Sequence, residues 1–178
     1  MNAGDAARLI ESAVLKGQRW ADLGAGTGTF TAALARLVGP AGAVYAVERD
    51  DTATHSLDAL AGERDPERAP IVVVRGDITE LLQLPLLDGA LLGNALHFVD
   101  ADHQAAVLQR IADGLVTGGA LLVIEYDNRA PSQWVPFPVS IARLRALADV
   151  AGLPTPHLIG RRRSDFGGIM YAASMARR

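Results

Sequence analysis

A short stretch near the start of the chain, residues 22–30, reads Asp-Leu-Gly-Ala-Gly-Thr-Gly-Thr-Phe and combines a carboxylate with closely spaced glycines. Glycine permits backbone conformations and close ligand approaches that a Cβ atom would forbid. A helix that begins directly after such a turn offers unpaired N–H groups, and these can bind a pyrophosphate or the carboxylate of an amino acid. The turn therefore predicts a cofactor site, and by itself it fits a dinucleotide and an amino-acid-containing cofactor equally well.

Two details of this turn favour the amino-acid-containing cofactor. The glycines follow the spacing Gly-x-Gly-x-Gly, and Thr29 stands where a dinucleotide-binding turn has its third glycine. Asp22 places a carboxylate just before the turn, where it would repel a pyrophosphate but could attract an ammonium or a sulfonium group.

Two further carboxylates follow the next predicted strands. Glu48 lies 20 residues beyond Gly28, a separation at which a carboxylate can accept hydrogen bonds from both ribose hydroxyls. Asp77, in Arg-Gly-Asp-Ile, is placed to accept a hydrogen bond from an adenine amino group. If both acids were only solvated strand ends, two coincidences in register with the turn would be needed, so we favour a nucleoside site.

The elements that must position these groups alternate between strands and helices. Strands are predicted where apolar and β-branched residues run continuously, and helices where apolar residues recur every three or four positions. The predicted strands are 19–23, 43–47, 71–75, 89–92, 120–126, 155–159 and 169–174, and a Gly118-Gly119 turn precedes the fifth. The predicted helices are 5–16, 30–38, 52–60, 101–115 and 139–151.

This alternation predicts an α/β fold with a mostly parallel sheet and helices on both faces. No clear helix separates the last two strands, so they should pair antiparallel. With 178 residues, the chain fits a single domain over residues 1–178. The basic run Arg161-Arg162-Arg163 is expected to be a solvated strand edge or loop.

The composition of the chain limits which kinds of partner and metal site we expect. The net charge of −3 gives no long-range attraction to nucleic acid, and the lack of cysteine excludes disulfides and thiolate metal sites. The four histidines show no metal-ligand spacing, so no metal is expected. We read no export signal at the N-terminus and no membrane-spanning apolar run. The expectation is a soluble, cytoplasmic protein with no nucleic-acid or membrane partner.

In these motifs the sequence resembles the class I S-adenosylmethionine-dependent methyltransferases over about residues 20–126. The resemblance implies a Rossmann-like, seven-stranded sheet of order 3-2-1-4-5-7-6 with an antiparallel last strand. It implies transfer of a methyl group from S-adenosylmethionine, with S-adenosylhomocysteine as the product. The acceptor is not identified, and we expect a small molecule.

By position, the resemblance assigns the methionine part of the cofactor to the glycine turn, the ribose to Glu48, and the adenine to Asp77 and Ile78. It places the residues after the fourth strand against cofactor and substrate. The implied cofactor-binding residues are Asp22, Gly24, Ala25, Gly26, Thr27, Gly28, Thr29, Phe30, Glu48, Asp77, Ile78, Asn94, Ala95 and Leu96.

A base is optional, because methyl transfer is an in-line displacement that mainly needs alignment and exclusion of water. His97 has a suitable ordinary pKa for accepting a proton, and Glu125 and Tyr126 end the fifth predicted strand on the substrate side. The alternative is that His97 only packs against Phe98 and that Glu125 binds a neighbouring loop.

Several readings stay open. A nicotinamide-dependent oxidoreductase shares the fold and the Glu48 position, but Asp22, the shifted glycine and the lack of a Tyr-x-x-x-Lys pair disfavour it. A non-catalytic S-adenosylmethionine-binding protein is another. Segment 134–137, with Trp134 and Phe137, either covers substrate, meets a partner or anchors the last helix. The short N-terminal region predicts an open cleft, hence a bulky acceptor or closure by a second subunit in a homodimer.

Overall fold

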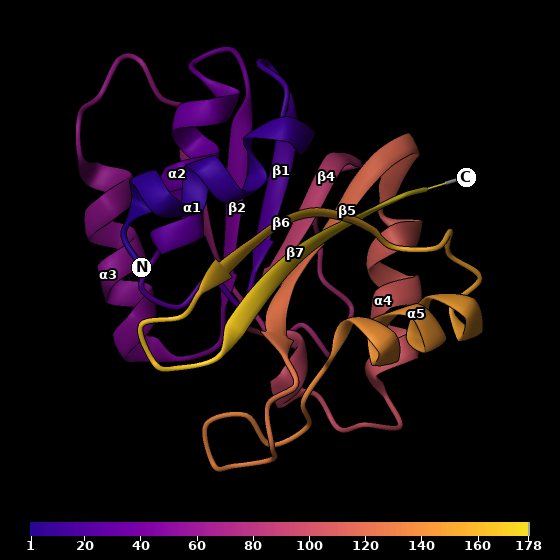
Figure 1. The fold of residues 1–178 in the computed structure, drawn as a ribbon. Helices are drawn as coiled ribbons and strands as arrows, with labels where there is room; N and C mark the ends of the chain where they lie inside the picture. The colour runs from indigo at the N-terminus through magenta and orange to yellow at the C-terminus, as the bar shows by residue number, and fades with distance from the viewer. Residues whose placement is uncertain (178) are drawn as a thin grey trace.

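A single seven-stranded sheet organises the computed structural model, which describes residues 1–177 (Figure 1). Its strands are β1 (Arg19–Leu23), β2 (Ala43–Glu48), β3 (Ile71–Arg75), β4 (Leu87–Gly93), β5 (Leu115–Asp127), β6 (His157–Arg163) and β7 (Ile169–Ala176). The order is β3-β2-β1-β4-β5-β7-β6. Strands β1 to β5 pair in parallel, and β7 pairs antiparallel with β5 and β6. The predicted fold class, strand order and antiparallel last strand are confirmed.

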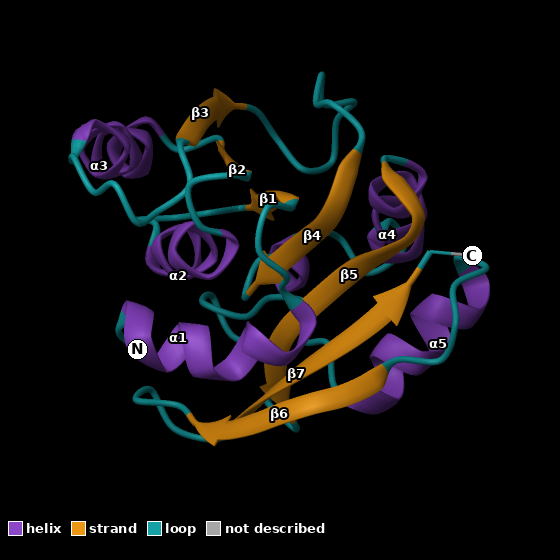
Figure 2. Ribbon diagram, turned by 90° about the horizontal axis from the view of Figure 1, so that it is seen from above, coloured by secondary structure: helices purple, strands orange, loops and turns teal. Residues whose placement is uncertain are grey.

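Five α-helices cover the two faces of this sheet. They are α1 (Ala3–Ile10), α2 (Thr29–Val38), α3 (Asp51–Gly62), α4 (Gln104–Asp113) and α5 (Ile141–Val150). Seen from above in Figure 2, α1, α2 and α3 lie on one side of the sheet and α4 and α5 on the other. Among residues 1–177, no helix has both the length and the apolar character needed to cross a membrane.

The continuous apolar strands build two cores because alternate side chains point to opposite faces. In β5, Leu121 and Val123 pack into the core under α4 and α5. Leu122 and Ile124, between and after them, pack into the core under α1 and α2. A strand covered on both faces therefore lies at the centre of the molecule, and its carboxyl end is held rigidly.

Several predicted element boundaries were wrong. The predicted helix 101–115 begins only at Gln104, and Leu115 already belongs to β5. The Gly118-Gly119 turn is part of the same strand, because Gly118 N–H donates to the Arg177 carbonyl and Gly119 accepts from the Arg177 amide. The opening helix ends at Ile10 and continues as a 3-10 turn, Glu11–Ala13.

The last strands are longer than predicted. Strand β6 extends to Arg163, so the basic run lies in it, at the edge of the sheet. Arg162 lies 3.5 Å from Asp5 and 3.6 Å from Asp165. Through Arg162, this run joins the edge strand to the N-terminal helix and to the β6–β7 connection, and its predicted place at a strand edge is observed.

Candidate functional site

The glycine turn occupies the carboxyl edge of the sheet between β1 and α2. Gly24, Gly26 and Gly28 all have a positive φ, of 73°, 53° and 91°. A Cβ atom on Gly24 would lie 2.7 Å from the Cβ of Ala95, which lies just after β4. A side chain at position 24 would therefore collide with Ala95. The Gly24 amide also donates to the Val47 carbonyl at 2.9 Å. Backbone conformation therefore favours glycine at all three positions, and space also requires it at Gly24.

Glu48, at the end of β2, fixes the turn in place. Its Oε2 accepts a hydrogen bond from the Gly26 amide at 2.8 Å. Its Oε1 accepts from the amides of Arg49 and Asp50 at 2.8 and 2.9 Å. With two lone pairs on each oxygen, only Oε2 keeps an open acceptor position. Accepting both ribose hydroxyls, as predicted, would require Glu48 to release a backbone amide.

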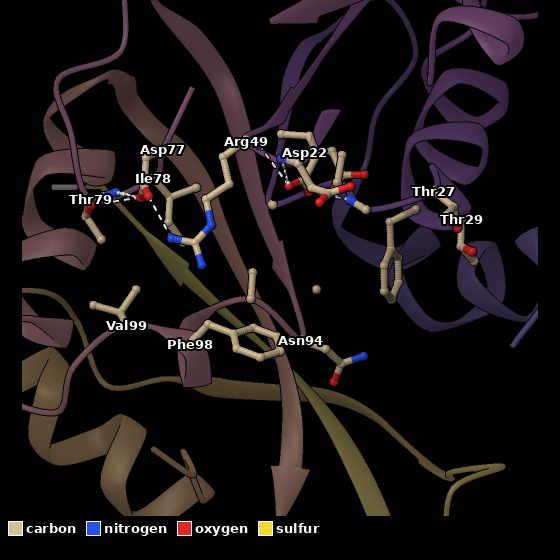
Figure 3. A pocket seen from close by; sticks show the side chains of 18 of the residues that line it. Asp22, Thr27, Thr29, Arg49, Asp77, Ile78, Thr79, Asn94, Phe98 and Val99 are labelled. Carbon is tan, nitrogen blue, oxygen red and sulfur yellow. Dashed lines mark hydrogen bonds and ion pairs between the residues drawn. The ribbon is translucent and has the colours of Figure 1, made fainter. Parts of the chain in front are cut away.

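Asp77, after β3, is similarly engaged. Its Oδ1 accepts from the amide and the hydroxyl of Thr79 at 2.8 and 2.7 Å. Its Oδ2 accepts from Arg49 Nη1 at 2.8 Å, and Figure 3 shows the two side chains facing each other. Partial burial acts to raise the pKa of Asp77, but these hydrogen bonds outweigh it and hold the pKa below its usual value. One lone pair on Oδ2 stays open to a ligand.

Asp22 is turned toward the protein. The carboxylate is 1% exposed and accepts a hydrogen bond from the Thr31 hydroxyl of α2 at 2.7 Å. Burial raises the pKa of Asp22 to about 7, and the charge of Glu48 adds to the effect while the Thr31 hydrogen bond opposes it. The raised pKa favours the neutral carboxyl and weakens the negative charge predicted here, and attraction of an ammonium or a sulfonium group by Asp22 stays a prediction.

These groups line one cavity of about 700 Å³. The predicted residues on its wall are Asp22, Gly24, Ala25, Gly26, Thr27, Thr29, Phe30, Glu48, Asp77, Ile78, Asn94 and Ala95. Two predicted residues are absent from this lining. Gly28 forms the left-handed N-cap of α2 and lies against leucines of α3. Leu96 is fully buried in the core on the α4 and α5 side and does not line the cavity, so its contact with the cofactor stays a prediction.

Gly93 and Phe98 also lie on the wall, at the end of the fourth strand that was expected to line the substrate side. Six wall residues were not predicted, and they are Met1, Arg49, Asp50, Thr79, Val99 and Phe166. Arg49 and Asp50 directly follow Glu48, so their position after a strand was a usable signal. Met1 and Phe166 carry no such local signal, because tertiary packing brings them to the site.

The three candidate bases do not line this cavity. His97, Glu125 and Tyr126 are 2%, 0% and 9% exposed. His97 Nδ1 lies 2.6 Å from Glu125 Oε2, and the His97 amide donates to Glu125 Oε1 at 3.1 Å. The ring of His97 also packs on Phe98, with centroids 4.4 Å apart. The observed geometry is thus the packing alternative, which ties the end of β4 to β5, and the base role stays a prediction.

Segment 134–137 is held against the rest of the protein at Val135 and Phe137, whereas Trp134 is exposed. Val135 is 3% exposed, and the Phe137 amide donates to the His97 carbonyl at 3.0 Å. Trp134 is 71% exposed and is not part of the cavity wall. Within residues 1–177, no group of three or more His, Asp or Glu side chains is arranged to hold a metal ion.

Comparison with known proteins identifies the family. A family model described as "Methyltransferase domain" matches residues 21–119, more than half of the chain. A carboxy-S-adenosyl-L-methionine synthase of Pseudomonas syringae pv. syringae (strain B728a) is 34% identical over 108 residues, covering 58% of this chain and 43% of the relative. The chain thus spans less than half the length of that curated relative.

Solved structures share the fold. A SAM-dependent methyltransferase from Aquifex aeolicus has a TM-score of 0.75 at 15% identity and covers 98% of this chain and 90% of its own. The 1,6-didemethyltoxoflavin-N1-methyltransferase of Burkholderia thailandensis has a TM-score of 0.75 at 19% identity, covering 98% and 77%. With the glycine turn, the strand order and the match over residues 21–119, the chain belongs to the methyltransferase domain family.

Proposed function

We propose that the chain binds S-adenosylmethionine in this cavity and transfers its methyl group to a small-molecule acceptor, leaving S-adenosylhomocysteine. One observation carries the proposal. The glycine turn, Glu48 and Asp77 follow three neighbouring strands and line a single cavity of about 700 Å³. Membership of the methyltransferase domain family supports the reaction class.

The described residues fit the parts of this cofactor. The turn leaves a cradle at Gly26 where nothing lies within 4 Å of an added Cβ, beside the N-terminus of α2. Amides at such a helix end suit the methionine carboxylate. The open lone pair of Glu48 Oε2 suits a ribose hydroxyl, and that of Asp77 Oδ2 suits the adenine amino group. Ile78 offers the adenine an apolar wall.

When bound, S-adenosylmethionine supplies a sulfonium methyl that is already activated for displacement. A lone pair of the acceptor atom forms the new bond to the methyl carbon, the carbon–sulfur pair returns to sulfur, and the acceptor releases a proton if it carries one. The protein's task is then to align the acceptor and exclude water. Asn94, Ala95 and Phe98, at and after the end of β4, stand on the wall where this alignment is needed.

The decisive experiment is calorimetric titration of the purified chain with S-adenosylmethionine, S-adenosylhomocysteine and NAD in parallel. We expect S-adenosylmethionine and S-adenosylhomocysteine to bind and NAD to give no heat. The Asp58→Asn variant is a control and should bind the nucleosides as the unaltered chain does, because it removes an exposed carboxylate of α3 that is not on the cavity wall. Tight NAD binding would refute the proposal and favour the oxidoreductase alternative. No response to either nucleoside at millimolar concentration would also refute the proposal.

Further parts of the proposal depend on the same site. We propose that residues 1–178 form one domain, since every strand within residues 1–177 belongs to one sheet. The didemethyltoxoflavin enzyme, by its name, acts on a small molecule, which supports an acceptor of that size here. A protein that binds the cofactor and finds no acceptor in a screen would match the non-catalytic alternative. The cytoplasmic location and the homodimer stay predictions.

A further inference from the structure

The cavity wall is divided by charge. All its charged side chains come from the turn and strand ends of β1, β2 and β3, and they are Asp22, Glu48, Arg49, Asp50 and Asp77. The rest of the wall includes Met1, Asn94, Ala95, Phe98, Val99 and Phe166, from the N-terminus, the end of β4 and the β6–β7 connection. No side chain of this second set is ionisable, and the Met1 ammonium is paired with Asp165 at 2.7 Å.

Two aromatic side chains on this uncharged part of the wall are open to solvent. Phe98 is 50% exposed and Phe166 is 78% exposed. Figure 3 shows Phe98 on the wall between Val99 and Asn94. Exposed aromatic rings that line a cavity are favourable contacts for an apolar ligand, since burial removes their surface from water.

Phe166 is held in place although its ring is exposed. The Arg129 guanidinium donates to the carbonyls of Phe166 and Gly167 at 3.2 Å each. The same guanidinium lies 4.4 Å from the centre of the Tyr126 ring. With the ion pair of Met1 and Asp165, the tip of the β6–β7 connection is tied down on two sides. A ligand that contacts Phe166 therefore loses little binding energy to ordering of the chain.

Asn94 adds one polar requirement. It has a left-handed backbone, with φ of 56°, and its side-chain Oδ1 is buried without a hydrogen-bond partner. A buried acceptor without a donor is costly, and a ligand that supplies an N–H or O–H removes that cost. Asn94 lies on the same wall as Phe98 and Phe166.

We propose that the methyl acceptor is an uncharged, flat aromatic molecule with a hydroxyl or N–H group, bound between the Phe98 and Phe166 part of the wall and Asn94. The inference rests on the proposed function, because it assumes that the charged part of the wall holds the cofactor. A charged acceptor would lose its hydration against neutral side chains, since the Met1 ammonium on this part of the wall is already paired with Asp165. The flat ring of such an acceptor would pack against phenyl side chains, and its hydroxyl or N–H group would donate to Asn94 Oδ1.

The test uses the chain saturated with S-adenosylhomocysteine and three probes: naphthol, decahydronaphthol and naphthalenesulfonate. Binding is measured by calorimetry. We expect naphthol to bind at least about tenfold more tightly than the saturated alcohol or the sulfonate. Phe166→Ala should weaken naphthol roughly tenfold, and Phe166→Leu by less, because leucine keeps apolar area without the ring. Trp134→Ala is the matched control, since Trp134 is also exposed but does not line the cavity.

The outcomes separate this inference from the proposed function. If S-adenosylhomocysteine itself does not bind, the proposed function fails. If it binds while naphthol does not, or while Phe166→Ala and Trp134→Ala affect naphthol equally, the acceptor inference alone is overturned. Equal binding of naphthalenesulfonate overturns it as well. Phe166 lies on an exposed tip, so its replacement leaves the core intact and the test interpretable.

Discussion

Glu48 accepts a hydrogen bond from the amide of Gly26 at 2.8 Å, so the acid assigned to the ribose also fixes the turn assigned to the methionine. The parts of the site assigned to the ribose and to the methionine are therefore joined directly by a hydrogen bond. Because Glu48 also accepts the amides of Arg49 and Asp50, removing the carboxylate disturbs the turn and the β2 end together.

Glu48→Ala is expected to weaken binding of S-adenosylhomocysteine and to destabilise the chain. It leaves three amides without their acceptor, which costs about 1–3 kcal/mol in unfolding free energy. The lost ribose contact adds to this, and the affinity should fall roughly 30-fold or more. Calorimetry and urea unfolding measure the two effects. Asp58→Asn should change neither, and a normal affinity for Glu48→Ala would remove Glu48 from the site.

The Gly26→Ala variant is expected to show whether glycine is needed here to leave space for the ligand or only to avoid backbone strain. Gly26 and Gly17 both have a positive φ, and nothing lies within 4 Å of an added Cβ at either position. Both alanine variants should lose a similar unfolding free energy, about 1 kcal/mol. Only Gly26 lines the cavity, so only Gly26→Ala should weaken S-adenosylhomocysteine, by about tenfold or more. Equal affinities of the two variants would mean that the ligand does not approach this turn.

The sequence predicted the glycine turn and the sheet because both depend on local patterns. Continuous apolar strands indicate a sheet covered on both faces, and the glycines are needed by conformations that other residues adopt poorly. The strand over residues 115–119 was not predicted, since Leu115 satisfies a helical pattern and Gly118-Gly119 resembles a turn. The pairing with Arg177 that makes it a strand comes from the far end of the chain.

In the uncharged part of the wall, Asn94 and Ala95 were predicted, but Met1 and Phe166 could not be, because distant parts of the chain bring them there. Met1 and Asp165 are 164 residues apart in the sequence, and their ion pair exists only in the folded chain. Glu125 did carry a signal, because a carboxylate inside an apolar strand covered on both faces must find a buried partner. The partner is His97, and the sequence alone did not indicate that both side chains point away from the cavity.

Asp22 predicts a specific dependence of stability on pH. Its pKa is raised from an ordinary 3.8 to about 7 in the folded chain, so the folded state holds this proton more tightly than the unfolded state. The stabilisation is present below pH 4 and is lost as pH rises through 7, on the order of 4 kcal/mol in unfolding free energy. Urea unfolding at several pH values measures it. Asp22→Asn should remove this slope, and an unchanged slope would mean that Asp22 titrates normally.

Arg49→Gln is expected to act on Asp77 and hardly on stability. The Arg49 side chain is 64% exposed, so the ion pair contributes less than about 1 kcal/mol. Loss of the guanidinium removes one of the interactions that lower the pKa of Asp77, and this pKa should rise. Carboxyl NMR titration measures it. Arg36→Gln, which alters an arginine of α2 outside the cavity wall, should leave the Asp77 titration unchanged.

Glu125→Gln tests whether the buried His97–Glu125 pair acts as structure. The pair is 2.6 Å apart and fully enclosed, and it links the residues after β4 to β5. The amide cannot accept from both the His97 ring and its backbone as the carboxylate does, and the unfolding free energy should fall by about 1–3 kcal/mol. Affinity for S-adenosylhomocysteine should stay within about twofold, because neither side chain lines the cavity. Unchanged stability combined with a large loss of affinity would instead place the pair in the binding site.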